Sequence, residues 1–560
     1  MKFLYSLFMG TVLAIQSISA AHPKFDLKES VFEQGFTVTG TIVDETGVPL
    51  PGASIIEKGS TNGVTSDFNG NFSITILDKN AILAISYIGF DSKEVPLNGQ
   101  STINVVLQEN ATGLDEVVLI GYGGVKASDA TGAVSSIKAE DFNGGVISSP
   151  EQLIQGKSAG VQITSSSGEP GSGINIRVRG TGSIRSGNQP LFVIDGVPIS
   201  GDNISDGGNV PGTGGTAPKN PLNFMNPNDI ASIDILKDAS ATAIYGSRGA
   251  NGVVIITTKK GSGKGSLNYA YSIGMSEITK KYDVGNAQEF LTGYSLVGGS
   301  DPNIDQGAET DWQDEILRTA ISQNHELSYG GGNQSGNYRF SFSHSDQQGI
   351  IKENGLERMT GRFNGNKKIL NDRLEISTQL TISNIHDDNV PITDSADHQG
   401  DLLAGALKTN PTRPVYNPDG TLYQPSRDNP NPVAFLELSR DFSNTLKFLG
   451  SFSADAELFE WLSFKTVYGI DRSMSTRKSA FSSELVAAVV NAEEDNGRAA
   501  INSIEIDNLL WENYFTVEHD FKDIGLDLNA VLGYSYQKFQ SSGNSMTAAD
   551  FRVTDLDLML

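Results

Sequence analysis

The residues most like a metal site form one cluster, which consists of His386, Asp387, Asp388, Asp394, Asp397 and His398. Imidazole nitrogens and carboxylate oxygens are the usual ligands of zinc and calcium. The intervening residues are polar and include a proline, a composition typical of a solvated loop. We therefore predict an acidic surface loop and assign no metal. Calcium is the alternative interpretation, because hard oxygen ligands are abundant here.

A second candidate is the run Gly-Ser-Gly-Lys-Gly-Ser at residues 261–266, which superficially resembles a phosphate-binding loop. In such loops the lysine precedes Ser or Thr and a helix follows, whereas Lys264 precedes glycine and strand-like sequence. We interpret the run as a hinge. The histidines at 325, 344 and 519 are scattered without a nucleophile elbow, and the chain has no cysteine. The sequence therefore predicts no catalytic residues, no metal, no cofactor and no enzymatic activity.

Length and charge limit the class of protein. A chain of 560 residues is expected to form several domains. Lys and Arg total 41 against 66 Asp and Glu, which gives a net charge of −25. A negative field repels phosphate backbones, and no basic stretch offsets it, so we expect no nucleic-acid partner.

The first residues predict export. Lys2 is followed by an apolar run from Phe3 to Ile15 and by small residues that end at Ala20 and Ala21, the order found in a secretory signal peptide. A buried N-terminal helix is the less favoured alternative, because polar sequence follows at once. Beyond this segment no run of about 18 apolar residues occurs, so only a closed β-barrel could cross a membrane. In a bacterium such a barrel lies in the outer membrane.

Residues 36–110 predict a small antiparallel β-sandwich, because short β-branched runs alternate with turns such as Pro51-Gly52 and Asn69-Gly70. The segments GTIVDETGVPLPGASI, GVTSDFNGNFSI and ISYIGF resemble the carboxypeptidase regulatory-like family. The family name suggests an enzyme, but this unit contains no histidine and no metal-ligand cluster. We therefore predict a module for stability and docking.

Residues 129–260 predict a mixed α/β unit. Ser149 is followed by a proline and, three positions later, by Gln152, an order that predicts a short helix that begins with a capping box. A second helix is expected between a cap at Asp238 and a stop at Gly246. Strands are expected at 174–180, 190–199, 233–236 and 253–258.

From residue 266 onward the sequence alternates. In SLNYAYSIGMSEI, RLEISTQLTISN and GLDLNAVLGYSYQ, apolar and aromatic side chains fall on one face and small or charged ones on the other. Transmembrane β-strands alternate in this way, but so do strands of a soluble sandwich or propeller, and alternation alone leaves both open. Clustered aromatics and long polar loops favour the barrel.

The linker between the first two units, residues 111–128, contains the stretch DEVVLIGYG at 115–123. Four consecutive aliphatic residues predict a buried strand. The flanking sequence looks like linker, so we expect a strand without a partner in this chain. The alternative is that it completes the sandwich.

The order of these units resembles the SusC/RagA family of TonB-dependent outer-membrane transporters. The stretches SSPEQLIQGKSAGVQI, GEPGSGINIRVRGTGSI, PLFVIDGVPI and NPNDIASIDILKDASATAIYGSRGANGVVIITTKKG follow the family's plug pattern nearly residue for residue. The stretch YGGGNQSGNYRFSFSHSDQQGIIK resembles the first barrel hairpin. The resemblance is strong over residues 36–365, and the rest of the chain resembles the family only in its general sequence character.

The resemblance implies that residues 129–260 form a plug inside a barrel of about 22 strands. It implies import of oligosaccharides, or in some members oligopeptides, beneath a SusD-like lipoprotein lid, with energy from the inner-membrane TonB–ExbB–ExbD complex. The linker strand would be the TonB box, which adds an edge strand to TonB from the periplasmic side. The TonB-binding residues would be Asp115, Glu116, Val117, Val118, Leu119, Ile120, Gly121 and Tyr122.

Two departures from the family pattern affect the expectation. Only residues 22–35 separate the signal peptide from the sandwich, so no signalling domain precedes it. The sequence after residue 266 suffices for roughly ten strands and lacks the usual terminal aromatic. We therefore expect an incomplete barrel that cannot transport alone. A secreted glycan-binding or adhesion protein is the alternative function, and an enzyme is the weakest.

Overall fold

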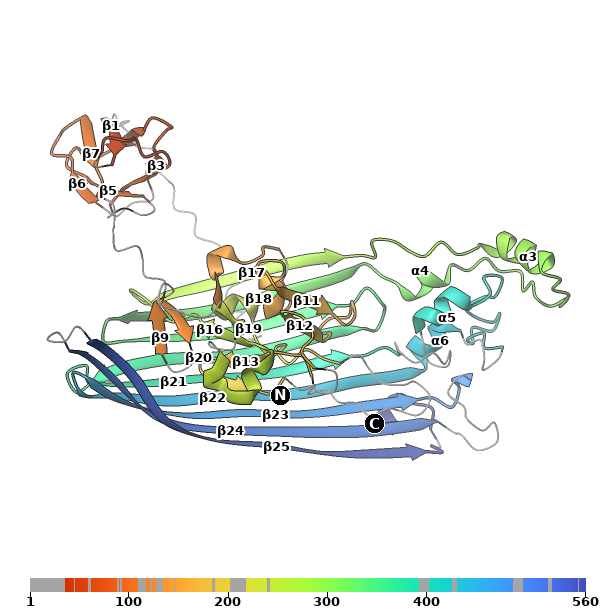
Figure 1. Cartoon of the computed structure of the whole chain (residues 1–560). Helices are drawn as coiled ribbons and strands as arrows, with labels where there is room; N and C mark the ends of the chain where they lie inside the picture. The colour runs from red at the N-terminus through yellow and green to blue at the C-terminus, as the bar shows by residue number, and fades with distance from the viewer. Residues whose placement is uncertain are drawn as a thin grey trace, which may run out of the picture. The chain divides into compact units, whose positions relative to one another are not determined.

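The computed structural model describes residues 36–44, 46–58, 62–87, 90, 93–108, 117–120, 123–126, 134–145, 147–183, 187–201, 218–238, 242–391, 402–425, 431–486, 497–521, 526–551 and 553–560. These residues form a mainly β protein (Figure 1). Two compact units divide between Asp115 and Glu116, and each is described by itself. The expected signal peptide, residues 1–21, lies outside the described residues.

The first unit is a β-sandwich, as the sequence predicts. Its strands are β1 (Phe36–Val43), β2 (Ser54–Glu57), β3 (Gly63–Thr65), β4 (Asn71–Ile76), β5 (Ile82–Ser86), β6 (Lys93–Pro96) and β7 (Thr102–Val106). They form a three-stranded sheet in the order β4-β1-β7 and a four-stranded sheet in the order β3-β2-β5-β6. Alternate residues such as Val38, Ile55 and Ile74 point into the shared core.

The second unit contains a mixed domain of strands and short 3-10 helices, which we call the α/β domain. Its elements are β10 (Val134–Lys138), η1 (Ala139–Asp141), η2 (Pro150–Ile154), β11 (Val161–Ser165), β12 (Ile174–Val178), β13 (Leu191–Ile194), β14 (Val197–Ile199), η3 (Pro227–Asp229), β15 (Ile230–Leu236), η4 (Ala243–Asn251) and β16 (Val253–Thr258). The main sheet has the order β10-β15-β16-β13-β14, and β11 pairs with β12.

Of the two helices expected in this domain, the first differs from the prediction. η2 is a single 3-10 turn, and the side chain of Ser149 makes no cap, because Oε1 of Gln152 instead accepts from the backbone N and Oγ of Ser148. The second expected helix stops at Gly246 as predicted, because this glycine has a non-helical backbone with a positive φ of 61°, and the chain forms a further turn beyond this kink. The backbone N of Thr242 donates to the carbonyl O of Asp238 (3.0 Å), which is a bond expected in the first turn of a helix capped at Asp238. Residues 239–241 lie outside the described part.

The rest of the second unit is one antiparallel sheet whose nine strands follow chain order (Figure 1). They are β17 (Ser266–Ser276), β18 (Ala320–Asn333), β19 (Gly336–Gln348), β20 (Gly355–Ile369), β21 (Leu374–Asp388), β22 (Ser439–Phe459), β23 (Leu462–Phe481), β24 (Arg498–Phe521) and β25 (Leu526–Ala549). β17 begins directly after Gly265, and no helix follows the glycine-rich run, as the hinge interpretation expects.

Short turns join the strands at one end of this sheet, and longer connections join them at the other. The longer connections carry α3 (Ala287–Leu296), α4 (Trp312–Ile316), α5 (Leu402–Lys408) and α6 (Pro432–Glu437), and α7 (Leu556–Met559) lies near the C-terminus. No helix in the described part of the chain is long and apolar enough to cross a membrane.

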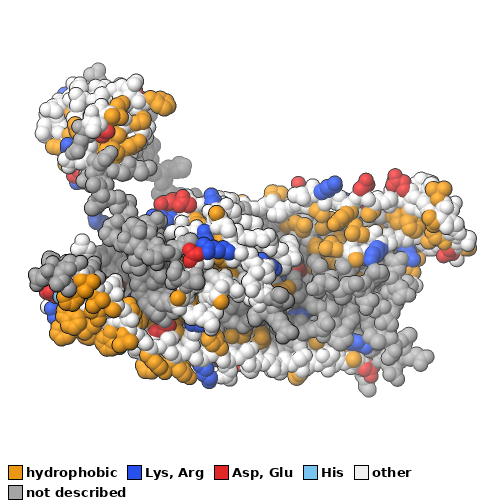
Figure 2. Space-filling model, in the orientation of Figure 1, with side chains coloured by type: hydrophobic (Ala, Val, Ile, Leu, Met, Phe, Trp, Pro, Cys, Tyr) orange, Lys and Arg blue, Asp and Glu red, His pale blue; other side chains and the backbone are white. Residues whose placement is uncertain are grey.

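The two faces of the sheet are chemically opposite. On β19, Ser341, Ser343 and Ser345 are buried against the α/β domain, whereas Phe340 and Phe342 face outward. Phe342 is 53% exposed and Ser343 only 2%. Hydrophobic side chains also gather on the surface near the end of β24 and the start of β25 (Figure 2). The sheet is therefore polar inside and apolar outside, the reverse of a soluble sandwich.

Candidate functional site

The strand expected in the linker is present, and it has a partner. β8 (Val117–Ile120) runs antiparallel to β9 (Gly123–Lys126), with Val118 opposite Val125. The expectation of an unpaired strand is therefore wrong. The glycine-containing segment downstream is close enough in sequence to fold back, and two-residue connections are common in hairpins. The alternative that β8 completes the sandwich is also wrong, because β8 joins neither of the sandwich's sheets.

Half of the expected TonB-binding residues lie in β8, and the others cannot be placed. Those in the strand are Val117, Val118, Leu119 and Ile120. Those outside the described residues are Asp115, Glu116, Gly121 and Tyr122. β8 lies beside β15 of the α/β domain. The hairpin therefore directly precedes the domain that contacts the polar face of the sheet.

One segment of the α/β domain crosses that polar face. Residues 219–229, which we call the strap, precede β15 and lie across β18 to β22. Its polar contacts with the sheet are Asn226 Nδ2 to Glu326 Oε2 (3.1 Å), Asp229 to Arg339 and to Ser341 Oγ (2.9 Å), Asn223 O to Arg358 Nη1 (2.7 Å), Phe224 O to Thr360 Oγ1 (3.1 Å), and Lys219 Nζ to Asp387 Oδ1 (3.4 Å). Phe224 also lies 5.3 Å from Lys447 Nζ.

Gly171 also contacts the strap, and the close approach requires a residue without a side chain. The carbonyl of Gly171 accepts hydrogen bonds from the backbone N of Asn220 (3.1 Å) and from Nδ2 of Asn223 (2.7 Å). Gly171 has φ +71°, and a Cβ there would lie 2.4 Å from Cδ1 of Leu356 and 2.8 Å from Nδ2 of Asn223. Only glycine fits this close approach of two backbones and the sheet.

Further polar contacts attach the domain beyond the strap. Arg362 of β20 bonds Asp195, in the turn between β13 and β14, and Thr258 at the end of β16. The backbone N of Ser200 donates to Oδ2 of Asp471 (3.2 Å), which also pairs with the buried Lys447. Buried ion pairs add orientation more than stability, because desolvation offsets much of their attraction. The domain is therefore seated in one specific position on the sheet.

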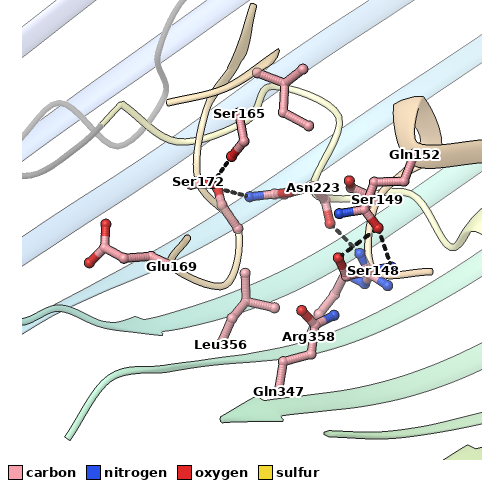
Figure 3. Close-up of a pocket in the computed structure, with 12 residues that line it drawn as sticks. Ser148, Ser149, Gln152, Ser165, Glu169, Ser172, Asn223, Gln347, Leu356 and Arg358 are labelled. Carbon is pink, nitrogen blue, oxygen red and sulfur yellow. Dashed lines mark hydrogen bonds between the residues drawn. The ribbon is translucent and has the colours of Figure 1, made fainter. Parts of the chain in front are cut away.

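Glu151, on η2, is a buried carboxylate beside the strap. It is 2% exposed, and its Oε1 accepts from Nδ2 of Asn220 at 2.5 Å. Burial raises the pKa of Glu151 to about 7, although Ser149, Asn220 and the charge of Arg358 act in the opposite direction. A polar cavity of about 30 Å³ lies next to it, between the α/β domain and the sheet (Figure 3). Ser149 and Gln152 line one side of this cavity, and Arg358 lines the other.

The acidic cluster differs from its prediction. His386, Asp387 and Asp388 end strand β21 instead of forming a solvated loop, because the alternation of β21 turns Asp387 inward to Lys219. Asp394, Asp397 and His398 lie outside the described residues. Within the described part, no group of three or more His, Cys, Asp or Glu side chains could hold a metal ion.

Sequence reasoning missed the strap, although a signal was present. Asn220, Asn223, Asn226 and Asp229 recur at every third position in a segment rich in proline and apolar residues. Residues three apart lie on one side of a 3-10 helix, but the prolines at 221 and 227 interrupt any long helix, so the regular spacing of polar side chains marks a segment with its own contacts. The partners on β18 to β21 could not be read from the sequence.

Comparisons with known proteins agree with this architecture. Residues 38–119 match the family described as CarboxypepD_reg-like domain, and residues 126–253 match the TonB-dependent receptor plug domain. TonB-dependent receptor SusC of Bacteroides thetaiotaomicron is 37% identical over 77% of this chain and 43% of its own length. TonB-dependent receptor P3 of Formosa agariphila is 36% identical over 92% of this chain and 49% of its own length. This chain thus spans about half the length of these relatives.

A solved structure titled as the RagAB peptide importer in the "open-open" state shares the fold. It has a TM-score of 0.67 and 23% identity, and the match covers 80% of this chain and 51% of that one.

The fold and the matches show a chain similar to TonB-dependent receptors, and the α/β domain described above matches their plug domain. More particularly, the chain is SusC-like: it is related over most of its length to the SusC-like TonB-dependent receptors. We call the α/β domain the plug from here on.

Proposed function

We propose that the protein imports oligosaccharides across the outer membrane with energy from TonB, ExbB and ExbD, beneath a SusD-like lipoprotein. The observation that carries the proposal is the plug seated on the polar face of a sheet whose other face is apolar. That arrangement suits a closed pore wall in lipid. In the proposed orientation the sandwich and β8 lie in the periplasm.

The proposed domain limits follow the same scheme. They are a signal peptide at 1–21, the sandwich at 36–110, a linker with the TonB box at 111–128, the plug at 129–260, and barrel strands at 266–560.

The chemistry of the inward face supports a neutral, hydroxyl-rich substrate. Serine and threonine recur along it, as at Ser343, Thr381, Ser443 and Ser475, all buried on the inward side. The ion pairs on the same face are locally compensated, as at Lys447 with Asp471. Hydroxyl groups exchange hydrogen bonds readily with sugar hydroxyls. Oligopeptide import by the same mechanism is the second candidate, because the RagAB peptide importer shares the fold.

We propose β8 as the segment that TonB binds. An extended segment can add a strand to an exposed sheet edge through main-chain hydrogen bonds. Because β8 is paired with β9, TonB would either add to the free edge of the hairpin or replace β9. The residues proposed to bind TonB are Asp115, Glu116, Val117, Val118, Leu119, Ile120, Gly121 and Tyr122.

Deletion of residues 115–122 in the native bacterium tests the proposal. Uptake of a fluorescent oligosaccharide, and in parallel of a fluorescent oligopeptide, is measured together with the amount of protein at the cell surface. We expect uptake of one class to be lost while surface assembly persists. Uptake of both probes at the wild-type rate would refute TonB-driven import through this segment.

A further inference from the structure

A buried polar pair connects the part of the plug that precedes the strap to the strap itself, beside the apolar contacts of the shared core. We call residues 134–165, which run from β10 to β11, the leading segment. Glu151 belongs to this segment, and Asn220 belongs to the strap. Both side chains are 2% exposed, and Nδ2 of Asn220 donates to Oε1 of Glu151. Oδ1 of Asn220 accepts from the backbone N of Leu222 (2.9 Å), so the amide is held in this orientation.

The leading segment is also attached through an edge strand. β10 pairs only with β15, at the end of the order β10-β15-β16-β13-β14. The rest of that sheet is tied to the barrel strands by Asp195, Thr258 and Asp229. β10 is also the first element after the β8–β9 hairpin. The plug therefore consists of a part mounted on the sheet and a leading segment that is attached to it through β10, through the pairing of β11 with β12, and through Leu153 and Ile154 in the core.

Two small cavities flank the Glu151–Asn220 pair. One, of about 30 Å³, is lined by Ser149 and Arg358, and the other, of about 20 Å³, is lined by Glu151 and Asn220 themselves. Each is large enough for about one water molecule and is lined by polar groups. Water therefore has a place to enter beside the carboxylate when the pair separates.

The charges around Glu151 come from several elements. Arg358 of β20 attracts it, and Asp229 of η3 acts in turn on Arg358. Lys219, next to Asn220 in the strap, pairs with Asp387 of β21. Glu169 lines the same cavity as Arg358. Acidic groups lie near each of these cations and weaken its attraction for Glu151. Burial therefore remains the largest influence on the pKa of Glu151.

We propose that Glu151 and Asn220 form a proton-controlled clasp between the leading segment and the strap, closed when Glu151 carries a proton and released when it ionises. A neutral carboxyl group can accept from Asn220 in this buried site. A carboxylate gains more free energy from the bulk water that only the separated state supplies. The inference deepens the proposed function, because release of the leading segment would be the first step in opening the plug.

The sign of the pH dependence follows from linkage. Burial raises the pKa of Glu151 from 4.5 to about 7, so the closed form keeps its proton up to about pH 7. An exposed carboxyl loses its proton above pH 4.5, and opening therefore releases one proton between these limits. The opening equilibrium rises about tenfold per pH unit between about pH 5 and pH 7, and it levels off above pH 7.

Hydrogen–deuterium exchange of the full chain in detergent tests the clasp. Wild type and Glu151→Gln are compared at the same pH, so that intrinsic exchange rates cancel for amides of identical sequence. We expect the wild-type to variant ratio of exchange in residues 134–165 to increase more than about tenfold from pH 5 to pH 7.5. Strap amides, in residues 219–229, should keep a constant ratio.

Glu140→Gln is the matched control, because Glu140 lies in the same leading segment but is exposed. It should reproduce the wild-type profile. A pH-independent wild-type to Glu151→Gln ratio would overturn proton control. Equal loss of protection in the strap and the leading segment would overturn the division of the plug. Exchange is measured without transport, so a failure of the import proposal would leave this result intact.

Discussion

Nζ of Lys219 lies 3.4 Å from Oδ1 of Asp387, and both side chains are almost fully buried, at 3% and 4% exposure. The first residue of the strap is thereby fixed to β21. Lys219 does not stand out in the sequence, and Asp387 does so only as one of the acidic residues in the cluster that resembles a metal site. Their pairing shows what fixes the position of the plug: individual charged residues of the plug pair with charged residues of the sheet.

Lys219→Met should destabilise the protein by about 3 kcal/mol, because it leaves the Asp387 carboxylate buried without a counter-charge. Thermal unfolding in detergent measures the change. The double variant Lys219→Met with Asp387→Leu should recover most of the loss, since an apolar pair avoids desolvation of both charges. A double variant less stable than the single one would contradict this account.

Asp229→Ala should cost more than Ser341→Ala, although both break the same hydrogen bond. The carboxylate of Asp229 accepts from Ser341 Oγ at 2.9 Å and also pairs with Arg339. Removing the hydroxyl costs about 1 kcal/mol, whereas removing the carboxylate leaves the largely buried guanidinium with Glu326 (3.1 Å) as its remaining ion-pair partner and costs about 2 kcal/mol. Denaturant unfolding of the two variants measures the difference, and equal losses would show that Glu326 alone satisfies the charge of Arg339.

Val118→Pro should abolish TonB-dependent uptake, because proline removes a backbone donor from the proposed TonB box. Val125→Pro is the matched control, since Val125 lies directly opposite in β9. It weakens the hairpin but leaves β8 intact, so uptake should persist or increase. Isothermal titration with the C-terminal domain of TonB checks binding directly. Loss of binding only in Val125→Pro would assign the TonB-binding strand to β9 instead.

Phe342→Lys should reduce the yield of membrane-inserted protein, with a cost of about 2–4 kcal/mol if the outer face of β19 contacts lipid. In a soluble sheet a lysine at a position 53% exposed would be nearly neutral. Phe68→Lys in the sandwich is the control, because Phe68 is 91% exposed and should tolerate lysine. Heat-modifiable gel mobility of the membrane fraction measures insertion. Equal tolerance at both positions would argue against a lipid-facing surface.

Much of the architecture follows from local pattern. The turn residues between short β-branched runs predicted the sandwich, and Asp67, for example, accepts from the backbone of Asn69 and Asn71 in one of those turns. Alternation predicted the long strands after Gly265. These features depend on neighbours in the sequence, and local patterns report them well.

Other features depend on residues far apart in the chain. Alternation alone could not say which face of β19 is buried, and only the plug packed on Ser341 and Ser343 decides it. The pairing of β8 with β9 was missed because a glycine-containing strand carries little side-chain signal.

The sequence by itself determined the order of the domains, the strands and the absence of cysteine chemistry, because these are written in composition and short-range periodicity. Only the tertiary structure decided which charges meet. Lys219 and Asp387 are 168 positions apart, and Glu151 and Asn220 are 69 positions apart. No local sequence pattern predicts either pairing. Burial strengthens the interaction within each pair, because a charge or carboxyl group removed from water interacts strongly with the few groups left beside it.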